Sequence, residues 1–140
     1  MVLISHSVLL EQTISGEKCT TWRANTGDHW YRISEKLKTT KLEGQHYWKV
    51  RVPKDKKPYH YIGTSRITHI VLRHIDTITL ADSFLDGFRG DITMMKAELV
   101  RLGGDDWYWQ IYYTPNWGYR KLYRQTGLMR LAQPASPTKI

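Results

Sequence analysis

Residues 67–80 read Ile-Thr-His-Ile-Val-Leu-Arg-His-Ile-Asp-Thr-Ile-Thr-Leu and form the most strand-like stretch of the 140-residue chain. Side chains branched at the β-carbon recur through it and suit a pleated, half-buried surface. Among them are Ile67, Val71, Ile75 and Ile78. The stretch therefore predicts a long β-strand, beside which the other segments are arranged.

Shorter segments on both sides of this stretch also have the character of strands. Residues 45–52 alternate apolar and polar side chains in their second half, residues 59–62 begin another strand, and residues 107–113 alternate again. Alternation of this kind places one face of a strand on a core and the other in water. Residues 29–33, which follow a turn signal, are predicted as a further strand.

Two helices are predicted. Residues 92–102 carry apolar side chains at i, i+3, i+7 and i+10, which is the spacing of an amphipathic helix. Asp91 can cap its first turn, and Gly103 ends it. Residues 8–14 predict a shorter helix, and the polar, lysine-rich residues 34–46 predict a loop.

The order of these elements predicts the fold class. A short helix, several strands, a second helix and a final strand favour an α+β fold with an antiparallel, barrel-like sheet, because a parallel sheet needs helices alternating with its strands. A chain of this length hides about two-thirds of its surface on folding, which suffices for one core. We expect one domain over residues 1–114, a basic extension packed on or beside it over 115–132, and a disordered tail over 133–140.

The composition points to an anionic partner. Lysine and arginine number 21 and acidic residues 13, so the formal charge is +8, and no acidic residue follows Asp106. The chain has nine tyrosines and six tryptophans but two phenylalanines, so most of its aromatic side chains carry a polar group. The single cysteine, Cys19, excludes an internal disulfide framework and a multi-cysteine zinc site. No apolar run approaches a membrane span of about 18 residues, and a single cysteine suits a reducing cytoplasm. We expect a cytoplasmic protein that binds no membrane, metal or cofactor.

Residues 14–23, Ile-Ser-Gly-Glu-Lys-Cys-Thr-Thr-Trp-Arg, hold the densest group of candidate functional side chains. In an extended chain successive side chains point to opposite faces. One face would then carry Lys18, Thr20 and Trp22, and the other Cys19, Thr21 and Arg23. Spacing alone does not bring Lys18 beside Thr21, and the residues by themselves leave a polar strand edge and a functional site both open.

The Gly-x-Lys-x-x-Thr-x-Arg pattern from Gly16 to Arg23 resembles the signature of the ASCH domain, a member of the PUA-like superfamily. Two further features follow in the family's order: the Gly27-Asp28 turn, and Asp86-Gly87-Phe88 before the predicted helix. The resemblance, closest to small bacterial or phage ASCH proteins, covers about residues 3–114. It implies a small PUA-like mixed or antiparallel β-barrel flanked by short helices, with a cleft lined by this pattern.

The same resemblance implies a chemistry for that cleft. Some ASCH proteins are amidohydrolases that deacetylate acetylcytidine with a lysine, a threonine and a carboxylate, which match Lys18, Thr21 and Asp86. Burial lowers the pKa of a lysine toward the range of a useful base. Those enzymes carry the longer glutamate where this chain has Asp86. Other ASCH proteins are described as RNA-binding or ribonucleolytic, so the resemblance leaves open whether the chain is an enzyme.

Aromatic and basic side chains are interleaved outside the motif, and such mixtures suit nucleic acid because bases stack on rings while cations follow the phosphates. The predicted nucleic-acid-binding residues are Lys18, Arg23, Trp48, Lys49, Arg51, Tyr119, Arg120, Lys121 and Arg124. We predict a domain that binds nucleic acid (RNA rather than DNA) or a modified base or nucleoside. The alternatives are amidohydrolase or ribonuclease activity in the same cleft, and a basic module that binds another protein.

Overall fold

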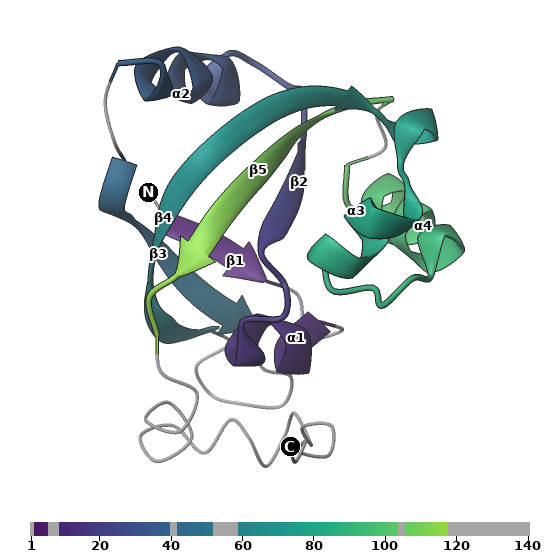
Figure 1. Ribbon diagram of the computed structural model, residues 1–140, viewed down its shortest axis with the longest axis horizontal. Helices are drawn as coiled ribbons and strands as arrows, with labels where there is room; N and C mark the ends of the chain where they lie inside the picture. Colours follow the sequence, from purple (N-terminus) through teal and green to yellow (C-terminus); the bar gives the residue numbers. More distant parts are fainter. Residues whose placement is uncertain (1, 6–8, 40–41, 52–58, 104–105, 118–140) are drawn as a thin grey trace.

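The computed structural model describes residues 2–5, 9–39, 42–51, 59–103 and 106–117, and the account below concerns these residues. Five strands form one sheet in the order β1–β3–β4–β5–β2 (Figure 1). They are β1 (Val2–Ser5), β2 (Thr20–Ala24), β3 (Leu42–Arg51), β4 (Tyr59–His74) and β5 (Trp107–Pro115). The sheet is mixed, because β1 pairs with β3 in parallel whereas the other neighbouring pairs are antiparallel.

Four α-helices surround this sheet, and the α+β class predicted from the element order is confirmed. They are α1 (Leu10–Ser15), α2 (His29–Leu37), α3 (Leu80–Leu85) and α4 (Ile92–Leu102). The helices α3 and α4 lie together on one side of the sheet, while α1 and α2 lie at opposite ends of the long strands (Figure 1). Between the edge strands β1 and β2 no pairing occurs in the described part of the chain, so the sheet is not closed into the expected barrel.

The helix predicted over residues 92–102 is confirmed at both ends. Asp91 accepts a hydrogen bond from the backbone N–H of Met94 at 2.9 Å, and Gly103 follows the last turn. The strands predicted over 45–52 and 107–113 correspond to β3 and β5. These elements carry their own local signals, namely a cap, a period and an alternation.

The strand predicted over residues 29–33 is wrong, because these residues begin α2. In the helix Arg32 pairs with Asp28 at 2.7 Å, Ile33 is buried, and the ring of Tyr31 packs against Trp109. Packing against a distant strand outweighs the strand preference of this aromatic and β-branched stretch. The predicted loop over 34–46 is accordingly divided between α2 and β3.

The strand predicted over residues 67–80 ends early. It joins the segment predicted at 59–62 as the single strand β4, gives way to a 3-10 turn at Ile75–Thr77, and leads into α3. Thr79 caps the start of α3, because its hydroxyl accepts from the backbone of Asp82 while the Asp82 carboxylate accepts from the backbone of Thr79. This capping box starts a helix that the β-branched pattern had concealed.

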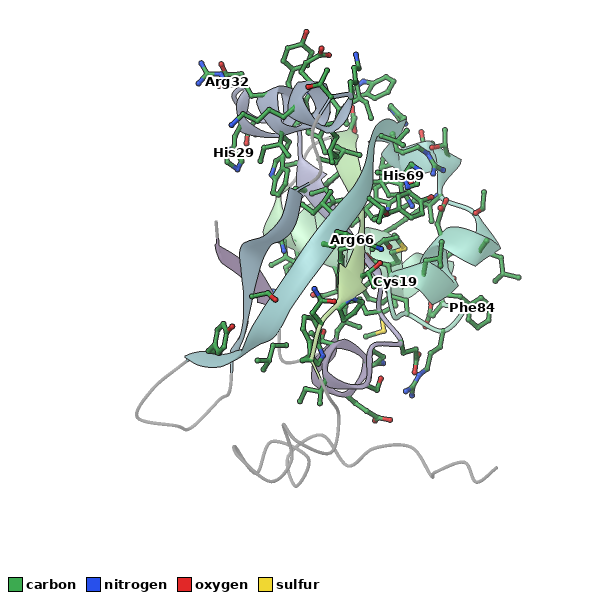
Figure 2. All side chains as sticks on the ribbon, turned by 60° about the vertical axis from the view of Figure 1, so that its left-hand side comes forward. Cys19, His29, Arg32, Arg66, His69 and Phe84 are labelled. Atoms are coloured by element: carbon green, nitrogen blue, oxygen red, sulfur yellow. The ribbon has the colours of Figure 1, made fainter. Side chains whose placement is uncertain are left out.

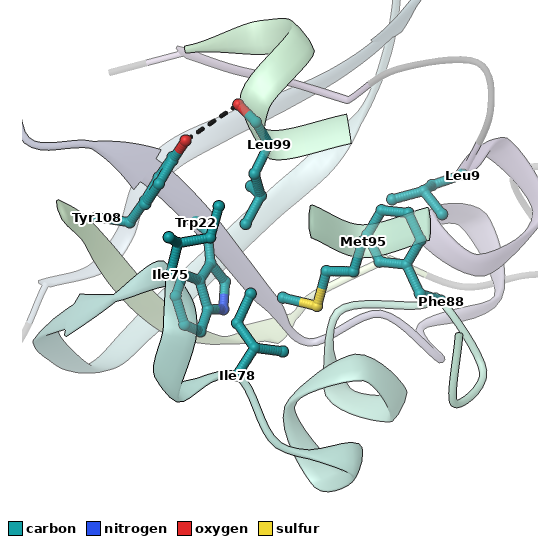
Figure 3. Packing of buried hydrophobic residues seen from close by; sticks show 8 residues of the cluster. All are labelled: Leu9, Trp22, Ile75, Ile78, Phe88, Met95, Leu99 and Tyr108. Atoms are coloured by element: carbon teal, nitrogen blue, oxygen red, sulfur yellow. Dashed lines mark hydrogen bonds between the residues drawn. The ribbon is translucent and has the colours of Figure 1, made fainter. Parts of the chain in front are cut away.

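The main apolar cluster fills the space between the sheet and the helices α3 and α4 (Figure 3). It consists of Leu9, Trp22, Ile75, Ile78, Phe88, Met95, Leu99 and Tyr108. The Tyr108 hydroxyl donates to the Leu99 carbonyl at 3.1 Å, which ties β5 to α4. None of the helices in the described ranges has both the length and the apolar character needed to cross a bilayer.

Two parts of the sequence prediction cannot be compared with the fold. The tail predicted over residues 133–140 lies outside the described residues, and so do all but the first residues of the extension predicted over 115–132. Both polar and apolar side chains are exposed on the helices. His29 and Arg32 project outward from α2, and Phe84 projects outward from α3, where Leu80 is also exposed (Figure 2).

Candidate functional site

The end of α1 sets the position of the Gly-x-Lys-x-x-Thr-x-Arg segment. Gly16 has the left-handed φ of 82° that L side chains rarely adopt, and its N–H donates to the Thr13 carbonyl at 3.3 Å. The backbone N–H of Lys18 then donates back to Gln12 at 3.0 Å, and that of Cys19 donates to Leu85 at 2.8 Å. The chain is therefore held between α1 and the end of α3 as it enters β2.

Lys18 and Asp86 meet in a buried ion pair. The Lys18 ammonium lies 2.9 Å from Oδ1 of Asp86, and the two side chains are 6% and 4% exposed. The same ammonium donates to the Thr20 carbonyl at 2.7 Å and to the Asp86 carbonyl at 3.3 Å. Two residues that the resemblance placed in one site, 68 positions apart, are thus in contact, and all three N–H groups of Lys18 are engaged.

Burial acts on both partners of this pair in the direction of neutrality. It lowers the pKa of Lys18 and raises the pKa of Asp86, while the attraction between the two charges opposes each shift. Thr20 supplies a further hydrogen bond, because its hydroxyl donates to Oδ1 of Asp86 at 3.2 Å. The threonine that joins the carboxylate is therefore Thr20, which the sequence prediction did not select although alternation had placed it on the face of Lys18.

Thr21 and Arg23 form a separate pair, as the alternation of β2 predicts. Nε of Arg23 donates to the Thr21 hydroxyl at 3.1 Å; Thr21 is buried and Arg23 half-buried. Burial lowers the pKa of Arg23, and the nearby Asp86 carboxylate counteracts this. Within the described part of the chain, Nη1 and Nη2 of Arg23 donate no hydrogen bond and no carboxylate pairs with them. The forked end of this guanidinium therefore keeps N–H groups that no described residue accepts.

Two residues beside Arg23 were not predicted from the sequence. Trp109 stands opposite Arg23 across the β2–β5 pairing, and its indole N–H donates to Oδ1 of Asn25 at 2.9 Å. The ring of Tyr31, 54% exposed, lies 6.5 Å from the ring of Trp109. An exposed ring, an exposed amide and an available guanidinium therefore border one surface formed by β2, β5 and α2. We call Arg23, Asn25 and Tyr31 the rim.

The loop that carries Asp86 is fixed on the segment around Lys18. Arg89 adopts a left-handed φ of 53°, unusual for a non-glycine residue, and its guanidinium binds Glu17 through two hydrogen bonds of 2.8 and 2.9 Å. It also donates to Glu11 at 3.2 Å. A Cβ added at Gly87 would lie 3.2 Å from the Cβ of Lys18, so glycine permits this close approach.

A second polar cluster lies one helical turn before Asp86, at Asp82. Its carboxylate accepts from Arg73 at 2.8 and 3.3 Å and from the buried amide of Gln110 at 3.1 Å. The guanidinium of Arg73 also lies 5.2 Å from the ring centre of Trp22. Although burial alone would raise the pKa of Asp82, these hydrogen bonds and that of its capping box hold the pKa below its usual range. Asp82 thereby anchors the helix that ends at Asp86.

The other sequence-predicted residues belong to other elements or lie outside the described residues. Trp48, Lys49 and Arg51 lie on β3, which β4 and β5 separate from β2. Cys19 is half-buried, and burial raises the pKa of its thiol, which disfavours a nucleophilic thiolate. Among the described side chains no three His, Cys, Asp or Glu residues are placed to hold a metal ion. The predicted residues Tyr119, Arg120, Lys121 and Arg124 lie outside the described residues.

Among known proteins, similarity to this chain is found at the level of solved structures. No protein-family model matches the chain, and no curated protein matches it significantly. The chain is similar to the crystal structure of protein EF3133 from Enterococcus faecalis V583, of the family model DUF984, with a TM-score of 0.46 and 13% identity. The match covers 95% of this chain and 77% of the other.

Proposed function

We propose that this chain is an ASCH-type, PUA-like domain that binds RNA, or a modified nucleic-acid base, at the surface bordered by Arg23 and Tyr31. The observation that carries the proposal is the half-buried guanidinium of Arg23, whose Nη1 and Nη2 groups hydrogen-bond to none of the described residues. A guanidinium removed from water in this way gains most from an anion that accepts two parallel hydrogen bonds, as a phosphate does.

The surroundings of Arg23 support an anionic ligand. The charge of Lys18 is matched by the Asp86 carboxylate at 2.9 Å, so the uncompensated positive charge of the site resides on Arg23. Tyr31 offers an exposed ring backed by Trp109, and a base stacked on an aromatic ring contributes about 1–3 kcal/mol. The formal charge of +8 supplies the long-range attraction that a polyanion requires.

Replacing Arg23 with glutamine is expected to weaken the binding of a short single-stranded oligoribonucleotide by about 10- to 100-fold, because a hydrogen-bonded charge contributes about 1.5–3 kcal/mol. The measurement is fluorescence anisotropy over a series of salt concentrations. The slope of log K against log salt concentration should also decrease in magnitude by about one, which corresponds to the loss of one phosphate contact.

The matched control is Arg101→Gln. Arg101 lies on α4, on the other side of the sheet, where it pairs with Glu98 at 2.7 Å, and its loss removes the same single charge. We expect this variant to bind within about threefold of the wild type. Equal losses of affinity in the two variants would show that binding depends on the overall charge and not on Arg23. A wild-type affinity that does not change with salt would contradict binding through phosphates.

The contact between Lys18 and Asp86 favours a second candidate, an amidohydrolase acting on an acetylcytidine-like nucleoside. The resemblance assigns catalytic roles to Lys18, Thr21 and Asp86, and the first and last of these are 2.9 Å apart. We rank it second because the three Lys18 N–H groups are already engaged and Thr21 bonds to Arg23. Release of acetate from acetylcytidine that disappears in Lys18→Ala and in Thr21→Ala, with both variants folded, would establish it; absence of acetate release by the wild type would exclude it.

A further inference from the structure

We propose that Asn25 makes the rim selective for keto bases, such as uracil, over amino bases, such as cytosine. The inference rests on the proposed function and specifies the ligand of the same surface. It derives from hydrogen bonds inside the protein, which leave only N–H donors unused on Arg23 and Asn25.

The orientation of the Asn25 amide is fixed by its partner. The indole N–H of Trp109 can only donate, so the atom that it reaches at 2.9 Å must be the amide oxygen of Asn25. The Nδ2 group of Asn25 then points to the other side of the amide, and it donates to none of the described residues. Asn25 is exposed, so this N–H₂ group faces solvent at the end of β2.

Arg23 complements Asn25. Arg23 stands opposite Trp109 in the β2–β5 pairing, and Asn25, which follows the last residue of β2, accepts the Trp109 indole N–H, so both residues border Trp109. Arg23 uses Nε to bind Thr21 and leaves Nη1 and Nη2 for a ligand. Both positions therefore present N–H groups, and the exposed ring of Tyr31 lies beside them against Trp109. A nucleotide can place its phosphate on Arg23, its base on Tyr31 and one base-edge atom on Asn25.

The occupied oxygen of Asn25 determines which base edge fits. Asparagine usually reads adenine with its oxygen and nitrogen together, and the bond from Trp109 takes the oxygen out of that pairing. The remaining N–H₂ group can donate to a carbonyl, as uracil presents at position 4, whereas cytosine presents an amino donor there. The Asn25 N–H₂ group and the amino group of cytosine are both donors and cannot hydrogen-bond to each other. We therefore expect Asn25 to favour bases with a carbonyl at this position.

The experiment compares the affinities of oligouridylate and oligocytidylate of equal length for the wild type, Asn25→Asp and Thr26→Asp. An aspartate at position 25 can still accept the Trp109 N–H but offers an acceptor where the amide offered a donor. Thr26 is exposed and adjacent, so Thr26→Asp adds the same charge without changing the amide. We expect the wild type to prefer oligouridylate by about fivefold, which corresponds to one neutral hydrogen bond.

Asn25→Asp is expected to abolish or invert this preference. Thr26→Asp is expected to weaken the binding of both oligonucleotides and to keep the ratio of their affinities. A wild-type ratio near one, or the same ratio in both variants, would overturn the inference and leave the proposed function intact if binding still depends on Arg23. Failure of the wild type to bind either oligonucleotide would reject the proposed function and the inference together.

Discussion

Replacement of Asp86 by alanine is expected to destabilise the protein by about 3–5 kcal/mol, because it leaves the Lys18 charge buried without a partner. The two side chains are 6% and 4% exposed, so water cannot replace the missing carboxylate. The hydroxyl of Thr20 loses its acceptor as well. Urea unfolding followed by circular dichroism measures the loss.

The double variant Lys18→Met with Asp86→Leu distinguishes a cost of charge from a cost of volume. Removing both charges and filling the space with apolar groups is often neutral or stabilising. We therefore expect the double variant to recover most of the stability that Asp86→Ala loses. A single variant that costs less than about 1 kcal/mol, or a double variant as unstable as the single one, would contradict the picture of a desolvated pair.

Replacement of Asp82 by alanine is expected to cost about 3 kcal/mol, since it removes the partner of Arg73, the acceptor for the Gln110 amide and one half of the capping box. Arg73 keeps its bonds to the Gln110 oxygen and the Thr77 carbonyl, at 2.8 Å each. The loss in the free energy of unfolding should therefore fall at the lower end of the range for removing one partner of a buried ion pair.

The pH dependence of stability gives an independent check on Asp82. Its pKa in the folded protein lies below that in the unfolded chain, so its contribution is complete above about pH 4. That contribution disappears as the pH falls through the folded pKa. Asp82→Asn should be less stable than the wild type at neutral pH and lose less stability on acidification. Parallel stability curves for the two proteins would contradict this assignment.

Some elements with local signals were predicted from the sequence, whereas others with such signals were missed. The helix α4 carries its own cap at Asp91 and its own apolar period, so its bounds were predicted correctly. The segment that forms α2 has a helical period, with Trp30, Ile33 and Leu37 at i, i+3 and i+7, but its aromatic and β-branched start at residues 29–33 has the composition of a strand. The burial of Ile33 and the packing of Tyr31 against Trp109, which is 78 positions away, favour the helix.

The candidate site divides in the same way. Lys18 and Asp86 were selected through the resemblance, and the alternation of β2 correctly grouped Thr21 with Arg23. Thr20 and Asn25 acquire their importance from partners 66 and 84 residues away. Such hydrogen bonds depend on the order of the strands in the sheet and on the position of α3. The spacing of residues within a ten-residue segment carries no information about either.

The central claim is that nucleic acid binds at the rim, and the most direct measurement is an NMR titration of the ¹⁵N-labelled protein with oligouridylate. The indole N–H of Trp109, assigned by its absence in Trp109→Phe, reports on the bond to Asn25, and Nε–H of Arg23 reports on the guanidinium. We expect these two resonances to show the largest saturable shifts. Saturable shifts confined to other residues, with both of these signals unchanged, would contradict the account.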